Sequence, residues 1–283
     1  MPDFDPTAKL EGFSYEEMLT QTVLGALEDA VPAEWPVELA LEGEMGKSLF
    51  TYPGAWLATL ERTKARGKLK KLRVGISANY ENARGQVKPD APAQQAMNAL
   101  IKAADFIGIS CYAKVSTPPK GEDFTAAVHH FAAEFAEAGT PIPRDKPLRF
   151  TEVGVGGGGF DKDWRLTVPS PTVEGMAKAA FFGTDDVAKN PWTREDLRTF
   201  RRQWHAAAMD FLRTQPADWK VTSAWLWSFG SWDVHGLEKQ EFRDDTIVRL
   251  IRDPTTVSSL AEPEHTDNAQ RTTDNAQRTG TLN

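Results

Sequence analysis

Short apolar runs of strand length recur along this chain and alternate with longer helix-like stretches. The runs begin near residues 37, 72, 105, 148 and 222. The helix-like stretches between them cover residues 56–66, 91–104, 124–138 and 195–214. Strands that alternate with helices at this interval are typical of βαβ units, which place their strands parallel in one sheet. The alternation therefore predicts an α/β fold with a parallel sheet.

Side-chain alternation within the runs indicates which kind of parallel sheet this is. In the first run Leu39 and Leu41 share an aliphatic face, whereas Ala40, Glu42 and Glu44 share the other. The second and third runs repeat this, with Val74 and Ile76 opposite Gly75, Ser77 and Asn79, and with Ile107 and Ile109 opposite Gly108, Ser110 and Tyr112. Helices cover both faces of a doubly wound sheet, so its strands are apolar throughout. A face of small and polar residues instead favours a (β/α)8 barrel of the TIM type, whose interior ends in functional groups at one mouth.

The fourth run departs from this alternation, because Leu148 and Phe150 share a face with Glu152. Only five strand candidates are visible, and a (β/α)8 barrel needs eight. Residues 1–36 read as a loop followed by one helix at 15–30, with Ser14 as its N-cap. We therefore expect a partial barrel with five visible strands. Its unpaired strand edges would need cover, and an oligomer is one way to provide it.

Length and composition divide the chain into one large domain and a tail. We expect residues 1–254 to form the N-terminally incomplete barrel, with a Gly- and Pro-rich insertion at 156–191. Residues 255–283 are polar and repeat one heptapeptide at 266–272 and 273–279. Such a segment buries too little apolar surface to fold, so we expect it to be disordered.

Two of the predicted strands end in a glutamate. Glu44 follows the first run and Glu152 ends the fourth, 108 residues later. Carboxyl ends of parallel strands meet at one mouth of a barrel, so these side chains are expected to lie near each other. Paired carboxylates are the groups that glycoside hydrolysis requires, one as proton donor and one as nucleophile.

Taken together, these residues resemble the retaining (β/α)8 glycoside hydrolases, and most closely the endo-β-mannanase-like branch. The resemblance covers roughly residues 15–250. It implies that the five visible strands are strands four to eight of the barrel and that the first three are absent. It implies that Glu44 is the acid/base after strand four and that Glu152 is the nucleophile at the end of strand seven. It also implies that the Tyr112 hydroxyl holds the nucleophile and that Trp227 forms the floor of the sugar site. Gly43 stands where the family usually has an asparagine, so an amide contact to the sugar is missing.

Each of these roles has a structural alternative. Glu42 shares the face of Glu44 and is the second candidate for the acid. Tyr112 is nearly as well explained as a buried structural tyrosine, and Trp227 as a core residue. Weaker candidates for sugar contacts follow the second and fifth runs, namely Asn79, Tyr80, Trp232, Asp233 and His235.

Charge and residue content argue against several other functions. The net charge of −7 disfavours nucleic acid or an anionic membrane as a partner. The single cysteine, Cys111, and five scattered histidines give no metal-binding pattern. Residues 154–159 contain G-x-G-x-x-G, but no helix-like segment follows, so no dinucleotide cofactor is expected. No signal peptide is visible, which predicts a cytoplasmic location, or a secreted one if a segment upstream is missing.

The leading hypothesis is a cofactor-independent glycosidase that acts on a β-linked poly- or oligosaccharide. A second hypothesis is an inactive truncated barrel that binds carbohydrate through its aromatic residues. A third is an α/β enzyme of another chemistry in which the glutamates are structural.

Overall fold

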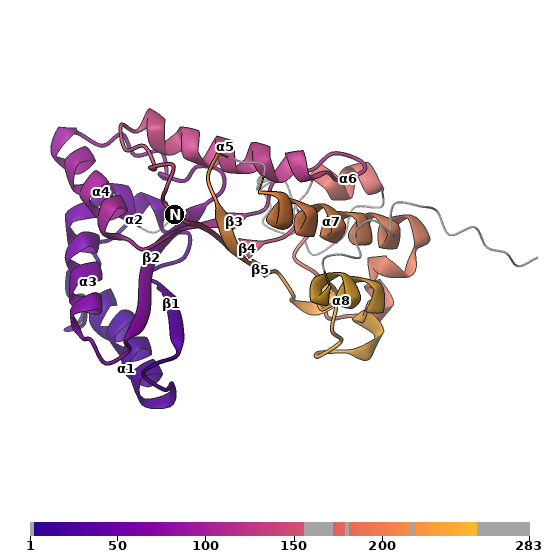
Figure 1. Cartoon of the computed structure of the whole chain (residues 1–283), viewed down its shortest axis with the longest axis horizontal. Coiled ribbons are helices and arrows are strands. Elements are labelled where there is room, and N and C mark those ends of the chain that lie inside the picture. Colours follow the sequence, from indigo (N-terminus) through magenta and orange to yellow (C-terminus); the bar gives the residue numbers. More distant parts are fainter. Residues whose placement is uncertain (1–2, 156–171, 179–180, 216–217, 254–283) are drawn as a thin grey trace, which may run out of the picture.

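The computed structural model describes residues 3–155, 172–178, 181–215 and 218–253 (Figure 1). Within them, five strands form one parallel sheet in the order of the sequence. The strands are β1 (Pro36–Ala40), β2 (Lys71–Asn79), β3 (Ile107–Cys111), β4 (Leu148–Val153) and β5 (Val221–Leu226). The predicted α/β class with a parallel sheet is confirmed, and the sheet curls like part of a barrel wall, which is consistent with a partial (β/α) barrel. The predicted tail at 255–283 and residues 156–159 of the Gly-rich run lie outside the described residues.

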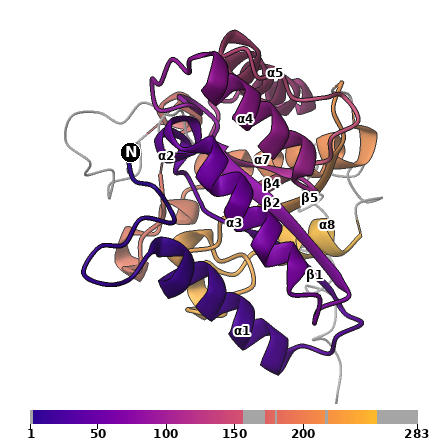
Figure 2. The ribbon, with the colours of Figure 1, turned by 90° about the vertical axis from the view of Figure 1, so that its left-hand side faces the viewer.

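Helices flank the sheet, most of them on its outer face. They are α1 (Gln21–Ala30), α2 (Gly46–Thr51), α3 (Pro53–Ala65), α4 (Ala91–Ala103), α5 (Gly121–Glu137), α6 (Val173–Lys178), α7 (Glu195–Thr214) and α8 (Asp245–Arg252). A π-helical turn, η1 (Glu16–Thr20), leads into α1, and a 3-10 turn, η4 (Gly230–Trp232), follows β5. Figure 2 shows α1, α3 and α4 in front of β1 and β2. The helix predicted at 195–214 has the bounds of α7, whereas α2 and α8 were not predicted.

The aliphatic face of each strand packs against these helices. Val74, Ile76, Ile107 and Ile109 are all buried, and the phenyl rings of Phe150 on β4 and Phe211 on α7 stack with centroids 5.8 Å apart. Burial of each large apolar side chain contributes roughly 1.5–3 kcal/mol, so this face supplies most of the driving force for folding.

Small residues are required on the inner face because the curl crowds it. A Cβ atom at Gly75 would lie 2.5 Å from the ring of Phe106. A Cβ atom at Gly108 would lie 2.6 Å from Thr151 Cγ2 and 2.8 Å from Ser77. The alternation of glycine and serine seen in the sequence therefore has a steric cause.

An ion pair crosses the inner face and links strands that are not neighbours. Arg149 on β4 donates from Nε and Nη2 to the two carboxylate oxygens of Glu38 on β1, at 2.9 and 2.8 Å. Strands β2 and β3 lie between them. In a flat sheet the two backbones would be roughly 14 Å apart with side chains pointing in the same direction. The contact forms because the sheet curls and turns these two side chains toward each other.

Candidate functional site

The carboxyl ends of the strands bring four of the predicted residues to one edge of the sheet. Glu44 lies in the loop after β1, Tyr112 directly follows β3, Glu152 is near the end of β4, and Trp227 directly follows β5. All neighbouring strands are parallel, so these ends share one edge.

A β-bulge places Glu152 on the inner face. The pairing of β3 with β4 runs Ile109 to Phe150 and then Ser110 to Glu152, which leaves Thr151 as an extra residue. A bulge inserts one residue and re-aims the side chains that follow it. Strict alternation predicted that Glu152 shares a face with Leu148 and Phe150. The bulge corrects that prediction and sets Glu152 beside Ser110.

The Tyr112 hydroxyl donates a hydrogen bond of 2.8 Å to Oε2 of Glu152. Burial of the ring, followed by this hydrogen bond and the negative charge of Glu152, raises the pKa of Tyr112 far above its usual range. The hydroxyl therefore remains a donor at all ordinary pH values. The ring meets Phe182 and Trp227 edge-on, with centroids 5.4 and 6.1 Å away.

Gly154 gives the Tyr112 ring its space. A Cβ atom there would lie 2.7 Å from Cε1 of Tyr112, closer than real side chains approach. The Gly154 N–H also donates to the Cys111 carbonyl at 3.1 Å, which fixes the backbone on both sides of the ring. The position of the tyrosine hydroxyl thus depends on a glycine two residues after the candidate nucleophile.

The Glu44 carboxylate is also held by a residue of β3, the strand that Tyr112 follows. Ser110 on β3 donates from Oγ to Oε1 of Glu44 at 2.6 Å. Glu44 has a left-handed backbone with φ of 60°, an uncommon conformation for a residue with a side chain. Such backbone strain is often found at functional sites. Because Ser110 is paired with Glu152 in the sheet, β3 connects the two carboxylates.

Glu42, the second candidate for the acid, is 4% exposed and is bonded only to backbone. Its Oε1 accepts from the Ser77 N–H at 2.7 Å and its Oε2 from the Met45 N–H at 2.9 Å. Burial, with a smaller effect of the Glu44 charge, raises the pKa of Glu42 to about 7. A glutamate in these surroundings can position the loop that carries Glu44, but it does not face the cleft described next.

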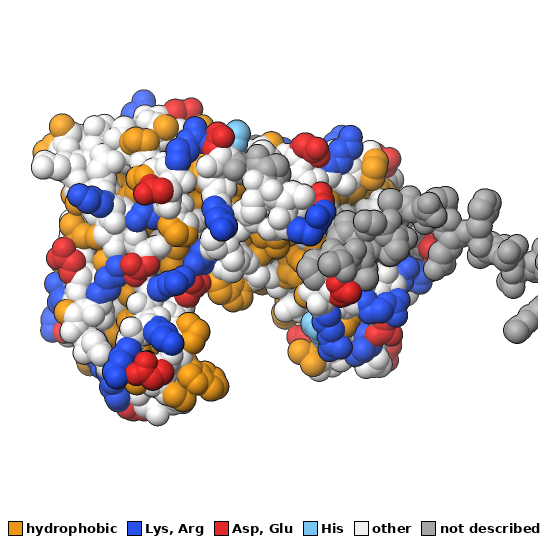
Figure 3. All heavy atoms as spheres, in the orientation of Figure 1, with side chains coloured by type: hydrophobic (Ala, Val, Ile, Leu, Met, Phe, Trp, Pro, Cys, Tyr) orange, Lys and Arg blue, Asp and Glu red, His pale blue; other side chains and the backbone are white. Residues whose placement is uncertain are grey.

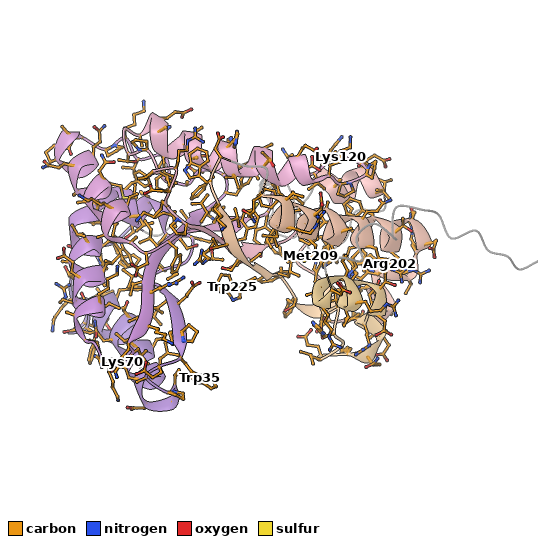
Figure 4. All side chains as sticks on the ribbon, in the orientation of Figure 1. Trp35, Lys70, Lys120, Arg202, Met209 and Trp225 are labelled. Carbon is orange, nitrogen blue, oxygen red and sulfur yellow. The ribbon has the colours of Figure 1, made fainter. Side chains whose placement is uncertain are left out.

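A cleft of about 450 Å³ lies beside Glu152 at the β5 edge of the sheet. Its walls combine aromatic and acidic side chains with the backbone after β5. They are Thr151, Glu152, Trp225, Leu226, Trp227, Ser228, Phe229, Asp233, Leu237 and Glu238. Figure 4 shows Trp225 below the sheet, pointing into the opening of the curl. The sequence reading did not single out Trp225, Phe229 or Ser110; polar and aromatic residues at strand ends are the signal that could have found them.

The weaker predictions fall in different surroundings. Asn79 lies at the end of β2, paired with Ser110, and its Oδ1 is buried without a hydrogen-bond partner among the described residues. The Tyr80 ring lies against His130 of α5, away from the carboxylates, with centroids 5.2 Å apart. Trp232 is 2% exposed and donates from Nε1 to the Phe181 carbonyl, so it packs in the core.

Trp227 is both a cleft residue and a packed one, since its Nε1 donates to the Phe182 carbonyl at 2.8 Å. Asp233 also reaches the cleft, but its carboxylate accepts from the backbone N–H groups of His235 and Glu238. Its first role is therefore to order the turn after η4.

Within the described ranges, no three His, Cys, Asp or Glu side chains gather closely enough to hold a metal ion. No helix among the described residues is long and apolar enough to cross a membrane. No protein-family model, curated protein or solved structure matches the chain. The function is therefore inferred from the geometry at the carboxyl ends of the strands.

Proposed function

We propose that this chain provides strands four to eight of a (β/α)8-type retaining glycoside hydrolase that cleaves a β-linked poly- or oligosaccharide. One observation carries the proposal. Two glutamates from strands at opposite parts of the curl, Glu44 and Glu152, are both held at the same mouth by hydroxyl groups of β3 and its end.

Glu152 is the nucleophile of the proposal and Glu44 the acid/base. The hydrogen bond from the Tyr112 hydroxyl orients the Glu152 carboxylate for attack on the anomeric carbon. Glu44 protonates the departing glycosidic oxygen in the first step. In the second step Glu44 takes a proton from the water that hydrolyses the glycosyl–Glu152 ester.

The cleft walls suit a sugar. Trp225 and Phe229 are 49% and 51% exposed and line the same cleft as Glu152. Aromatic faces provide large apolar area for the C–H surfaces of a pyranose, and polar groups at their edges fix its orientation. An uncharged polysaccharide is also compatible with a chain of net charge −7.

The test is turnover of soluble β-mannan, β-glucan and aryl β-glycosides by the full chain and three glutamine variants. Glu152→Gln is expected to lose activity on every substrate, because no nucleophile remains. Glu44→Gln is expected to lose it on the polysaccharides but to keep part of it on aryl glycosides, whose leaving groups need little protonation. Glu61→Gln, a change of the same kind on the exposed surface of α3 outside the cleft, is the matched control. Wild-type turnover in Glu152→Gln would refute the proposal.

The second candidate is a carbohydrate-binding chain without activity, which the two open strand edges favour. It predicts a cooperative melt, saturable binding of the polysaccharides and no turnover. Trp225→Ala is then expected to abolish binding, whereas Glu152→Gln is expected to leave it intact. Binding that is equally lost in both variants would contradict this candidate.

A further inference from the structure

Every exposed large hydrophobic side chain among the described residues lies in one of two segments. Six occur before β1 and three follow the start of β5. They are Leu10, Phe13, Met18, Leu19, Val23 and Trp35, and then Trp225, Phe229 and Leu237. Figure 3 shows hydrophobic side chains along both margins of the hollow in the molecule, and Figure 4 places Trp35 and Trp225 there. Leu19 and Val23 lie beside β1, and Trp225, Phe229 and Leu237 lie beside β5, so both open edges of the sheet carry exposed apolar side chains.

The β1 edge has the form of a groove for a strand. A cavity of about 310 Å³ lies between β1 and the η1–α1 helix, with Leu19 and Val23 on the helix side and residues 39–43 on the strand side. A helix that precedes a parallel strand is half of a βαβ unit, and right-handed crossovers place the first strand of that unit on the free side of the second. The groove occupies the position of that missing strand.

The backbone along this groove is ready to pair. The Leu41 N–H donates to the Gly75 carbonyl of β2, so the N–H and C=O of Ala40, one residue earlier, point to the free side. At the opposite edge, β5 is paired on one side with β4 and has no other neighbour among the described strands. Because β1 and β5 are parallel, β5 from a second molecule has the polarity that the β1 edge requires.

We propose that two copies of this chain associate with β5 of each copy lying along β1 of the other. A two-fold axis parallel to the strands satisfies both edges of both copies and leaves no open edge. The nine exposed side chains expose from 39% to 87% of their surface. At roughly 200 Å² for each large side chain, they provide on the order of 1,000 Å² per copy. A stable interface needs about 800 Å² per partner, whereas the largest patch on a monomer is typically about 300–600 Å².

The pairing of β5 with β1 of the second copy also completes the cleft. Trp225 and Phe229 line it from the β5 edge, where the described chain has no further wall. The β1 strand of the second copy supplies that wall. The association does not require the glycosidase proposal, because it depends only on the sheet edges and their apolar margins.

The test is sedimentation equilibrium of the full chain at concentrations from about 1 to about 100 μM, a range over which a dimer with micromolar affinity dissociates. The expected mass is twice the 31.3 kDa of one chain at the upper end. Leu19→Glu places a charge in the β1 groove and is expected to weaken association at least tenfold. Ala99→Glu adds the same charge at an exposed position of α4 and is the matched control.

A second variant tests the backbone hydrogen bonds that the proposed pairing requires. Ala40→Pro removes the N–H that points to the free side and is expected to dissociate the dimer, while circular dichroism confirms that the variant remains folded. A wild-type chain that is monomeric over the whole range would overturn the proposal. The proposal would also be overturned if Leu19→Glu dimerised as tightly as Ala99→Glu. The apolar edges would then be assigned to a different polypeptide.

Discussion

Replacement of Glu42 by glutamine should remove a large pH dependence of stability. This carboxyl group is buried, and its pKa is raised from 4.5 to about 7 by loss of solvent. Between these two pH values the folded protein keeps the proton that the unfolded chain has released. The folded state therefore binds more protons, and the free energy of unfolding falls as the pH rises.

The magnitude follows from the two pKa values. Their difference of about 2.5 corresponds to about 3 kcal/mol at 1.36 kcal/mol for each pKa unit. Below pH 4.5 the carboxyl is protonated in both states, so its stabilising effect relative to the ionised form is complete. The effect declines as the pH rises and is gone above pH 7, where both states are ionised.

The Glu42→Gln variant cannot titrate at this position. Its amide nitrogen cannot accept from the backbone, so one of the bonds to Ser77 and Met45 is lost, at a cost of about 1–3 kcal/mol. We therefore expect the variant to be less stable than the wild type near pH 4.5. The difference between the free energies of unfolding of the two proteins should shrink by about 3 kcal/mol between pH 4.5 and pH 8.

The assay is urea denaturation of both proteins from pH 4.5 to pH 8, read as the difference between their free energies of unfolding. The other carboxylates are the same in both proteins, so their contribution cancels in this difference. Glu61→Gln, on the exposed surface of α3, controls for the loss of one carboxyl group. A difference between Glu42→Gln and wild type that is constant with pH would refute the argument.

Two further predictions concern packing and charge at the inner face. Gly154→Ala should lower the free energy of unfolding by about 1–3 kcal/mol because its Cβ meets the Tyr112 ring, whereas Gly43→Ala meets nothing within 4 Å and should be nearly neutral in urea melts. Arg149→Met should destabilise the fold by about 2–4 kcal/mol because it leaves the partly buried Glu38 with only its longer contact to Arg73, at 3.5 Å. The double variant with Glu38→Gln should recover part of that loss, and additive effects of the two single changes would contradict a direct interaction.

The sequence predicted the order of the elements and the two faces of the first three strands well, because both are local properties. Alternation between Val74 and Gly75 reports which side chain faces the helices, and no knowledge of the neighbouring strand is needed. The bounds of α7 were predictable for the same reason, since a long amphipathic pattern repeats over many turns.

Features that depend on the register between strands were not predictable. The bulge at Thr151 exists only as a mismatch in pairing between β3 and β4, and the residues around it show no pattern that indicates an extra residue. The bond from Ser110 to Glu44 joins residues 66 positions apart, so its pairing cannot be read from either segment. Trp232 was expected to contact sugar, but the turn at η4 directs its ring into the core beside Trp192 and Trp204.

The candidate site has a rigid part on β3 and a less constrained part at the β5 edge of the sheet. This difference predicts which part loosens first. All five residues of β3 are buried and the strand has a partner on each side, so Ser110 belongs to the most constrained strand of the sheet. The aromatic wall of the cleft comes from β5 and its end, which is paired on one side only. Local opening begins where contacts are fewest, so the Trp225 wall should loosen before the carboxylates separate. Under the proposed function, an isolated copy is therefore expected to lose affinity for sugar first, and closure of the β5 edge is expected to restore affinity without changing the geometry around Glu152.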